Sequence, residues 1–329
     1  MRFKLLASLA GAAVATAMLT TLGVAQAQTT LRLAHQFAPD SLPGKSAQKF
    51  ADSVAAKTNN AVKVTVLPSG SLGDERANLQ QLGAGTIDLA LTGDLVISFM
   101  ARPYMIVSMP FLYATPEHSL AVFNGEIGNE INALLVKDHK VRVLGWQYVG
   151  TRVLTANQPV RNLAELKGLK FRLAPAEMWV KTWEKTGTNI ASIAFTELYL
   201  ALQTGTVSGQ ENPPNFIRAQ KFHEVQKYIM KTDHVPQMQA LFASEQKFSA
   251  MDPKVRDAVS EAAKETVAWT TAQAKDAQAA DLAWLAKEGK MQIVDINLTG
   301  IQDLIAKVPE EVLGADGRKL YDRIMAAKK

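Results

Sequence analysis

The 329-residue chain contains no cysteine. It therefore has no disulfide bond, no thiolate ligand for zinc or an iron–sulfur cluster, and no cysteine nucleophile. Aromatic residues account for 7% of the chain and charged residues for 20%, and beyond residue 27 no apolar run is long enough to cross a bilayer. The absence of cysteine excludes a small disulfide-stabilised protein, and the absence of long apolar runs beyond residue 27 excludes a polytopic membrane protein. The length is that of about two globular domains.

The chain also has no large excess of positive or negative charge, because it contains 36 Lys and Arg and 31 Asp and Glu, which gives a formal net charge of +5. The basic residues form no cluster, so no nucleic-acid partner is expected. Five histidines are present, and no two of them have the spacing of metal ligands on a helix. We therefore expect neither a metal nor a cofactor.

The first 27 residues have the pattern of a cleaved export signal. Arg2 and Lys4 precede an apolar stretch over residues 5–24, and an A-x-A sequence follows at residues 25–27. The alternative is a membrane anchor, but the stretch is rich in Ala, Gly and Thr rather than in Leu and Ile. We predict a signal peptide over 1–27, a mature chain that starts near Gln28, location in the periplasm and no stable membrane insertion.

Segments with strand character alternate with segments of helical periodicity in the first part of the mature chain. Val62, Val64 and Val66 alternate with polar residues as in a half-buried strand, and Asp74 is placed to cap the next helix. Strands separated by helices of about ten residues predict βαβ units and a largely parallel sheet. The fold class expected is therefore α/β.

Two longer helices are predicted further along the chain. One begins at the cap Thr115-Pro116 and extends to about Val136. The other begins at Asp252-Pro253 and ends near Gly289. This second helix is longer than one small lobe requires, so we expect it to pack against two lobes.

Two short patterns favour an enzyme of the penicillin-recognising serine class. Ser46 and Lys49 form an S-x-x-K, and residues 185–187 form a K-T-G. However, no S-D-N lies between them, and the K-T-G ends a predicted helix, whereas the chemistry needs it on an edge strand. A serine acyl-enzyme is therefore only the alternative interpretation, and we expect no catalytic residue.

Two arginines indicate a site for a small anion. Arg152 follows Gly150-Thr151 at the start of a strand, and Arg172 lies between apolar residues within another strand. Burial of an arginine is costly unless a carboxylate or phosphate pairs with its charge. The planar guanidinium group binds a carboxylate through two parallel hydrogen bonds. The competing interpretation is a side chain whose stem covers apolar surface while its head reaches water.

Several sequence blocks, in this order, are similar to those of the periplasmic solute receptors of TRAP (tripartite ATP-independent periplasmic) transporters, the DctP family. The resemblance covers essentially the whole mature chain. The blocks are Leu72-Gly73-Asp74-Glu75-Arg76, residues 81–89, Gly150-Thr151-Arg152, residues 166–172, residues 195–205, Gly209-Gln210-Glu211-Asn212-Pro213 and residues 222–228.

The resemblance implies a two-lobe periplasmic-binding-protein fold of type II-like form, with a hinge and a long helix that spans both lobes. We expect lobe 1 to comprise residues 28–149 and 239–278, and lobe 2 to comprise residues 150–238 and 279–329. The family binds its ligand between the lobes and performs no chemistry.

The resemblance also implies roles for residues of lobe 2. Arg172 matches the arginine that anchors the substrate carboxylate, and Arg152 matches one that assists it. Asn212 matches an asparagine that hydrogen-bonds the same end of the ligand. Phe195 matches a residue that packs against the ligand, although it is equally suited to the core.

Further candidates come from lobe 1 and the strand before Arg152. Gln36 and Glu75 match polar positions that bind the rest of the substrate, and His35 is adjacent to Gln36 and able to donate to a hydroxyl. Trp146 and Tyr148 precede the crossing and are placed to stack on the ligand, because ligands bind at strand ends in such folds. The same two rings are equally suited to the core.

The expected function is that of a receptor that binds a small organic acid and delivers it to the small and large membrane subunits of a TRAP permease. A receptor for an ATP-driven importer is a second alternative. C4-dicarboxylates, sugar acids, hydroxy acids and aromatic acids all fit one arginine anchor, while the acid Glu75 favours a hydroxyl donor over a second carboxylate. The residues around Gly93-Asp94 differ from those of the sialic-acid branch, so sialate is not the expected ligand.

Overall fold

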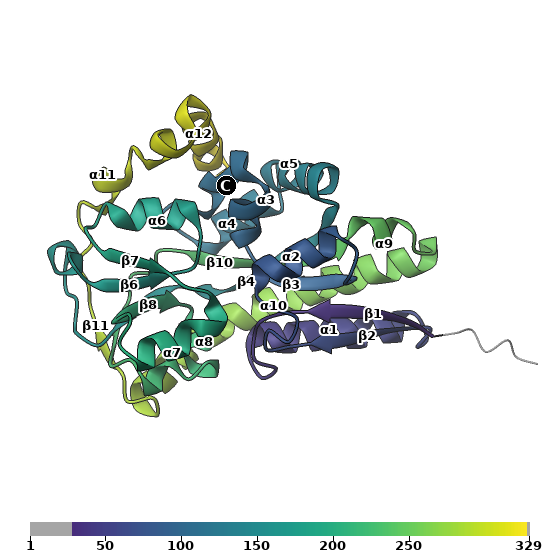
Figure 1. The fold of residues 1–329 in the computed structure, drawn as a ribbon, viewed down its shortest axis with the longest axis horizontal. Coiled ribbons are helices and arrows are strands. Elements are labelled where there is room, and N and C mark those ends of the chain that lie inside the picture. The colour runs from purple at the N-terminus through teal and green to yellow at the C-terminus, as the bar shows by residue number, and fades with distance from the viewer. Residues whose placement is uncertain (1–27, 328–329) are drawn as a thin grey trace, which may run out of the picture.

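The computed structural model describes residues 28–327, which form two mixed β-sheets surrounded by helices (Figure 1). The predicted signal peptide, residues 1–27, lies outside the described residues. Within the described part of the chain, no helix is both long and apolar enough to span a bilayer. The α/β two-lobe prediction is confirmed, and we call the first sheet with its helices lobe 1 and the second sheet with its helices lobe 2.

The sheet of lobe 1 has five strands in the order β2-β1-β3-β10-β4. β1 pairs in parallel with β2 and β3, as predicted, whereas β10 runs antiparallel to both β3 and β4. A late segment of the chain is thereby inserted into a sheet built from early ones. The strands are β1 (Thr29–Ala34), β2 (Val62–Leu67), β3 (Leu89–Gly93), β4 (Val141–Thr151) and β10 (Pro236–Ser244).

The sheet of lobe 2 has six short strands in the order β11-β9-β5-β8-β6-β7. β5 is antiparallel to both of its neighbours, and the pairs at the two edges are parallel. The strands are β5 (Val153–Ala156), β6 (Lys170–Leu173), β7 (Asn189–Ser192), β8 (Gly209–Asn212), β9 (Tyr228–Met230) and β11 (Gln292–Val294).

Helices cover both sheets. Those of lobe 1 are α1 (Leu42–Lys57), α2 (Glu75–Gly83), α3 (Leu95–Met100), η1 (Arg102–Ser108), α4 (Pro116–Phe123), α5 (Glu126–Leu134), the π-helical turn η2 (Leu135–His139) and α9 (Glu245–Ser249). Those of lobe 2 are η3 (Leu163–Leu166), α6 (Glu177–Glu184), η4 (Phe195–Glu197), α7 (Leu198–Gln203), α8 (Pro214–Ala219) and η5 (Phe222–Glu224).

Helix boundaries follow the predicted caps, with one exception. The Asp74 carboxylate accepts a hydrogen bond from the Ala77 amide at the start of α2, as predicted. The single helix predicted over 115–136 is wrong, because it divides into α4 and α5. Gly128 passes so close to Phe123 that an added Cβ would lie 1.8 Å from the Phe123 carbonyl oxygen, so a tight reversal separates the two helices.

Three segments cross between the lobes. β4 continues into β5 through Arg152, and β9 continues into β10; the Arg152 amide donates to the Val235 carbonyl at 2.9 Å, which joins these two crossings. The third crossing is α10 (Pro253–Lys287), which packs on α1 and β4 in lobe 1 and on α8 in lobe 2 (Figure 1). The predicted spanning helix is confirmed.

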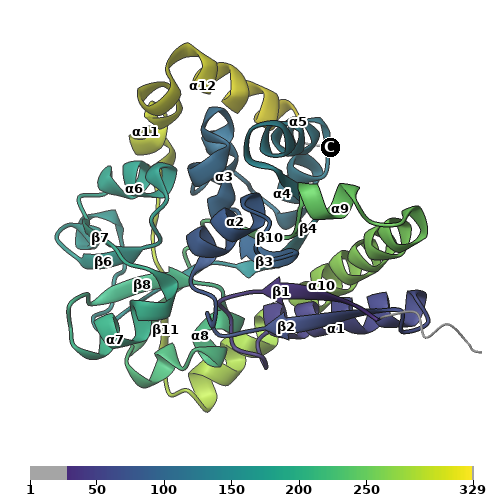
Figure 2. The same ribbon diagram turned by 45° about the vertical axis from the view of Figure 1, so that its right-hand side comes forward.

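The C-terminal helices also contact both lobes. α11 (Ile301–Ile305) and α12 (Val308–Ala326) arch over α6, α3 and α5 in Figure 2. Lys185, after α6, pairs with Glu311 at 2.6 Å, and Arg323 pairs with Glu130 of α5 at 2.6 Å. Between these two attachments α12 is interrupted at Gly314, which has a positive φ of 61°. The expected division, which assigns residues 279–329 to lobe 2, stays a prediction; in the structure α11 and α12 contact both lobes.

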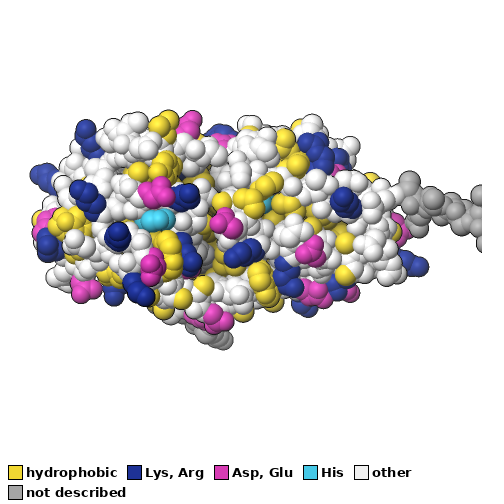
Figure 3. Space-filling model, turned by 90° about the horizontal axis from the view of Figure 1, so that it is seen from below, with side chains coloured by type: hydrophobic (Ala, Val, Ile, Leu, Met, Phe, Trp, Pro, Cys, Tyr) yellow, Lys and Arg dark blue, Asp and Glu magenta, His cyan; other side chains and the backbone are white. Residues whose placement is uncertain are grey.

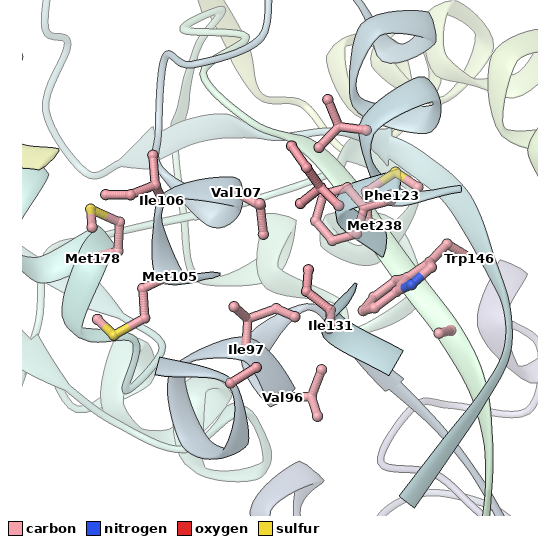
Figure 4. Close-up of a cluster of buried hydrophobic side chains, with 14 of the residues drawn as sticks. Val96, Ile97, Met105, Ile106, Val107, Phe123, Ile131, Trp146, Met178 and Met238 are labelled. Atoms are coloured by element: carbon pink, nitrogen blue, oxygen red, sulfur yellow. The ribbon is translucent and has the colours of Figure 1, made fainter. Parts of the chain in front are cut away.

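The largest hydrophobic cluster lies above the lobe 1 sheet (Figure 4). Trp146 of β4 packs edge-on between Phe123 of α4 and Phe242 of β10, with ring centroids 4.7 and 5.7 Å apart. Met178 of α6 reaches the same cluster from lobe 2. Each large apolar side chain buried here contributes roughly 1.5–3 kcal/mol, so the cluster fixes the sheet whose strand ends form the site.

Candidate functional site

A cavity of about 50 Å³ lies between the two lobes, where strands of both sheets end. Its size fits a small molecule rather than a peptide or an oligosaccharide. Lobe 1 contributes polar side chains from several elements, and lobe 2 contributes two arginines, an asparagine and aromatic rings. The polar residues that line it are Gln36, Asp74, Glu75, Arg76, Asp94, Arg152, Arg172, Asn212, Gln237 and Gln239.

Arg172 lies in β6, where its neighbour Phe171 points into the core of lobe 2 and Arg172 therefore points the other way, into the cavity. Its side chain is 1% exposed, and its Nε and Nη2 donate to the Ile193 carbonyl at 2.9 and 2.7 Å. Among residues 28–327 no carboxylate pairs with it. Burial lowers the pKa of Arg172 to about 10, although it still carries its charge at neutral pH. The cavity thus holds a buried cation without a counter-ion.

Arg152 is buried beside the same cavity but is already paired. Its Nε and Nη2 bind the two carboxylate oxygens of Glu211, and Nη2 also donates to the Asn212 Oδ1 at 3.1 Å. Nη1 donates to the Gln237 side-chain oxygen, and the guanidinium lies 4.6 Å from the ring centre of Trp179. The predicted assistance to the ligand stays a prediction, because most of this guanidinium is used in holding the crossing together.

Glu211 and His234 complete the Arg152 network. Burial alone would raise the pKa of Glu211, but Arg152 and His234 outweigh it and hold that pKa below its usual value. The His234 Nε2 lies 3.0 Å from a Glu211 carboxylate oxygen, and burial lowers the pKa of His234. The network is therefore an internal ion pair with a neutral imidazole beside it.

Two further carboxyl groups face the cavity from lobe 1. Glu75, the first residue of α2, accepts a hydrogen bond from the Gly93 amide at 2.7 Å, and burial raises the pKa of Glu75 to about 7. Asp94 accepts from the Gln237 side-chain amide at 2.8 Å, and burial raises its pKa to about 6. Gly93 lies between them, and a Cβ there would approach the Glu75 Oε1 to 3.1 Å.

The remaining walls combine amides and aromatic rings. The Asn212 amide donates to the Gln210 side-chain oxygen at 2.5 Å, and Gln239 has a buried Oε1 with no hydrogen-bond partner among the described residues. Phe195 and Phe216 pack against Phe37, with ring centroids 5.7 and 5.3 Å away, and line one end of the cavity. One side of the cavity is thus apolar.

The structure brings together six of the nine residues predicted for the site. Those that line the cavity are Arg172, Arg152, Asn212, Phe195, Gln36 and Glu75. Trp179 of α6 also lines the cavity, while its neighbour Met178 lies in the hydrophobic cluster.

Trp146, Tyr148 and His35 do not line the cavity. Trp146 lies six residues before Arg152 on an extended strand, which separates the two by about 20 Å, and it is in the hydrophobic cluster. The Tyr148 hydroxyl forms a hydrogen bond with the Thr151 hydroxyl at 2.7 Å. The His35 Nδ1 accepts a hydrogen bond from the Phe37 amide in the same loop, and burial lowers the pKa of His35 to about 4.

The serine pattern does not form a site. The Ser46 hydroxyl is fully buried, donates to Gln147 at 3.0 Å and accepts from Thr270 at 2.9 Å. Lys49 instead lies over the ring of Trp269 at the surface. Within the described chain, no group of three or more His, Asp and Glu residues is placed to hold a metal ion.

A wider groove of about 610 Å³ lies between α1, α8 and α10 and is larger than the cavity. Its Arg218 is paired with Asp281 at 3.0 Å and stacks on Trp284, and its two lysines, Lys45 and Lys221, are exposed to solvent rather than buried as Arg172 is. Figure 3 shows basic and acidic side chains interspersed on the face seen from below, without a patch of one sign. The smaller cavity with the unpaired Arg172 is therefore the better binding site.

Asp94, Glu211, Gln237 and Gln239 were missed from the sequence. Glu211 directly precedes Asn212 in a sequence block that carries the family resemblance, and this adjacency could have indicated that Glu211 lies near the site. Gln237 and Gln239 alternate with apolar residues in β10, a pattern that normally indicates a solvent-exposed strand face. Their position in the cavity depends on the long-range pairing of β10.

Comparison with known proteins identifies the family. The family model described as bacterial extracellular solute-binding protein, family 7 (DctP), matches residues 33–313. The sialic acid-binding periplasmic protein SiaP of Vibrio cholerae is 30% identical over 263 residues, which are 80% of this chain and 82% of SiaP.

Two solved structures share the fold. A TRAP periplasmic solute-binding protein from Bordetella bronchispeptica, with density assigned to pantoate, has a TM-score of 0.86 and 27% identity and covers 92% of this chain and 100% of its own. One from Polaromonas sp. JS666, bound to D-erythronate, has a TM-score of 0.85 and 28% identity and covers 92% and 99%. With the family match, these similarities exclude the acyl-enzyme interpretation: the chain belongs to family 7 of the bacterial extracellular solute-binding proteins, the periplasmic solute receptors of TRAP transporters.

Proposed function

We propose that this receptor captures a small monocarboxylate that carries hydroxyl groups and delivers it to the small and large membrane subunits of a TRAP permease. The export signal over residues 1–27 agrees with a receptor that works in the periplasm. The three crossings between the lobes provide a hinge about which the cavity opens and closes.

The observation that carries this proposal is the buried, unpaired guanidinium of Arg172. A ligand carboxylate at its remaining N–H groups supplies the missing counter-charge through a charge-assisted hydrogen bond. When the lobes close, water leaves and the effective dielectric constant falls, which strengthens this interaction. Asn212 lies beside Arg152 on the same wall and is within the cavity lining.

The opposite wall favours hydroxyl groups. The Gln239 Oε1 and an ionised Glu75 or Asp94 accept hydrogen bonds, and a protonated carboxyl group donates one, so a hydroxyl, which both donates and accepts, fits this wall. A second carboxylate would meet two acidic groups and be repelled by them. D-erythronate, bound in one similar structure, and pantoate, to which density in the other is assigned, each combine one carboxylate with more than one hydroxyl.

A thermal-shift titration tests the proposal, because a ligand that binds the folded state alone raises Tm. Pantoate and D-erythronate should raise Tm more than succinate does. In calorimetry, Arg172→Ala should weaken binding about 30-fold or more, equivalent to about 2 kcal/mol, and Arg172→Lys should also bind poorly because it lacks the planar fork.

Arg161→Ala, which removes an exposed arginine outside the cavity, is the matched control and should bind as the unmodified protein does. Unchanged affinity in Arg172→Ala would reject the anchor. A larger Tm shift with succinate than with either hydroxy acid would reject the substrate class.

A further inference from the structure

Glu75 and Asp94 lie on either side of Gly93 at the cavity wall and are only 5% and 1% exposed. Each receives one strong hydrogen bond from the protein: Glu75 from the Gly93 amide and Asp94 from Gln237. Gln237 also accepts from Arg152, so its amide links Asp94 to the arginine network. Within the described chain neither carboxyl group forms a salt bridge with a cation, in contrast to Glu211.

The charges of the cavity do not balance when a ligand anion enters. Arg152 and Arg172 are positive, and Glu75 and Asp94 are negative. Glu211, which lies behind the lining, is the negative partner of Arg152, so these five groups carry one excess negative charge when all are ionised. A ligand carboxylate raises this excess to two in a closed, poorly solvated space.

Neighbouring groups from the adjoining elements that the structure describes offer no further counter-charge. On α2, Asp74 and Arg76 carry opposite charges at the cavity edge, and the buried Tyr113 near Asp94 is held neutral, since burial raises its pKa well above the usual value. His234 is neutral at the far side of Glu211. None of these neighbours supplies a compensating cation, and a proton on one carboxyl group would remove the excess negative charge.

We propose that the Glu75–Asp94 pair takes up one proton as the ligand carboxylate docks on Arg172, so that capture of the anion is coupled to protonation of the receptor. The proton comes from solvent and joins one carboxylate oxygen; no other covalent bond forms or breaks. The protonated carboxyl donates to a ligand oxygen, while its ionised partner accepts from a ligand hydroxyl. This inference rests on the proposed function.

The resting state of the pair agrees with this coupling. Burial raises the pKa of Glu75 to about 7 and that of Asp94 to about 6, and the charge of Asp94 adds to the increase at Glu75. The negative charge of the docked ligand carboxylate further opposes ionisation of the Glu75–Asp94 pair. The pair therefore keeps its proton to higher pH when the ligand is bound. The proton is therefore taken up above about pH 7 and is already in place at lower pH.

Calorimetry of the unmodified receptor with D-erythronate and pantoate is the decisive experiment. At pH 8, titration in buffers of different ionisation enthalpy should give an uptake of close to one proton per ligand. The ligand carboxyl, with a pKa of about 3.5, remains ionised throughout and supplies none. An uptake of zero in both titrations would overturn the inference.

The pH dependence of Kd locates the proton. Kd should be constant below about pH 6 and should rise by up to about tenfold per pH unit above pH 7. Glu75→Gln should abolish most of this slope and Asp94→Asn should reduce it, whereas Glu310→Gln, an exposed carboxylate on α12, should retain it. A full slope in Glu75→Gln and in Asp94→Asn would contradict the assignment.

The outcomes separate this inference from the receptor function. Binding without proton uptake rejects the coupling and leaves the hydroxy-acid receptor intact. Failure of both acids to bind at pH 5.5 and at pH 8 rejects the proposed ligand class and the coupling with it. If either variant does not fold, the buffer titration of the unmodified protein still decides.

Discussion

The crossing at Arg152 and the strand at Arg172 place the same residue type beside one cavity in opposite electrostatic situations. Arg152 is bound on three sides by Glu211, Asn212 and Gln237, whereas Arg172 donates only to a backbone carbonyl among the described residues. Both side chains are almost fully buried. Burial is common to both arginines and does not distinguish them, whereas the missing counter-ion does, and on that ground we propose Arg172 as the ligand anchor.

The largest expected effect comes from breaking the paired arginine. Arg152→Ala leaves the Glu211 carboxylate buried without its partner, so the free energy of unfolding should fall by about 3–5 kcal/mol. Urea denaturation measures this loss. The exposed pair of Arg102 with Glu177 is the matched control, and Arg102→Ala should cost less than about 1 kcal/mol. Equal losses in the two variants would refute the distinction.

A second change in the same network should recover part of that loss. Adding Glu211→Gln to Arg152→Ala removes the stranded charge, and about 1–3 kcal/mol of stability should return because a buried amide needs no counter-ion. The same denaturation experiment measures the recovery. A double variant less stable than Arg152→Ala would mean that Glu211 supports the fold through His234 rather than through the arginine.

The smallest effect on stability is expected at the unpaired arginine. Arg172→Met loses the hydrogen bonds to Ile193 but also removes a buried charge, so the ligand-free protein should unfold within about 1 kcal/mol of the unmodified one. Denaturation without ligand tests this. A loss as large as that of Arg152→Ala would show that Arg172 is structural, and the comparison would then fail.

Much of the fold could be predicted from local patterns. The alternation at Val62, Val64 and Val66, the cap Asp74 and the long helix from Asp252 all depend on neighbouring residues and are confirmed. The division of residues 115–136 into two helices occurs at Asn124-Gly125, a pair typical of turns, which helical periodicity does not record.

The candidate site divides in the same way. The roles of Arg172, Glu75 and Asn212 were predicted from the resemblance to the receptor family, and all three residues line the cavity. Gln237 and Gln239 reach it because β10 crosses from lobe 2 and pairs antiparallel between β3 and β4. That pairing joins residues far apart in the chain, so the face they present could be assigned only from the tertiary structure.

The C-terminal helix α12 has a mechanical consequence for the movement of the lobes. Glu311 ties its first half to lobe 2, and Arg323 ties its second half to lobe 1. Gly314 interrupts the helix between the two ties. α12 therefore joins the two lobes as two helical segments that meet at Gly314, and not as one continuous rod, so a change in the angle between the lobes need not bend a continuous helix.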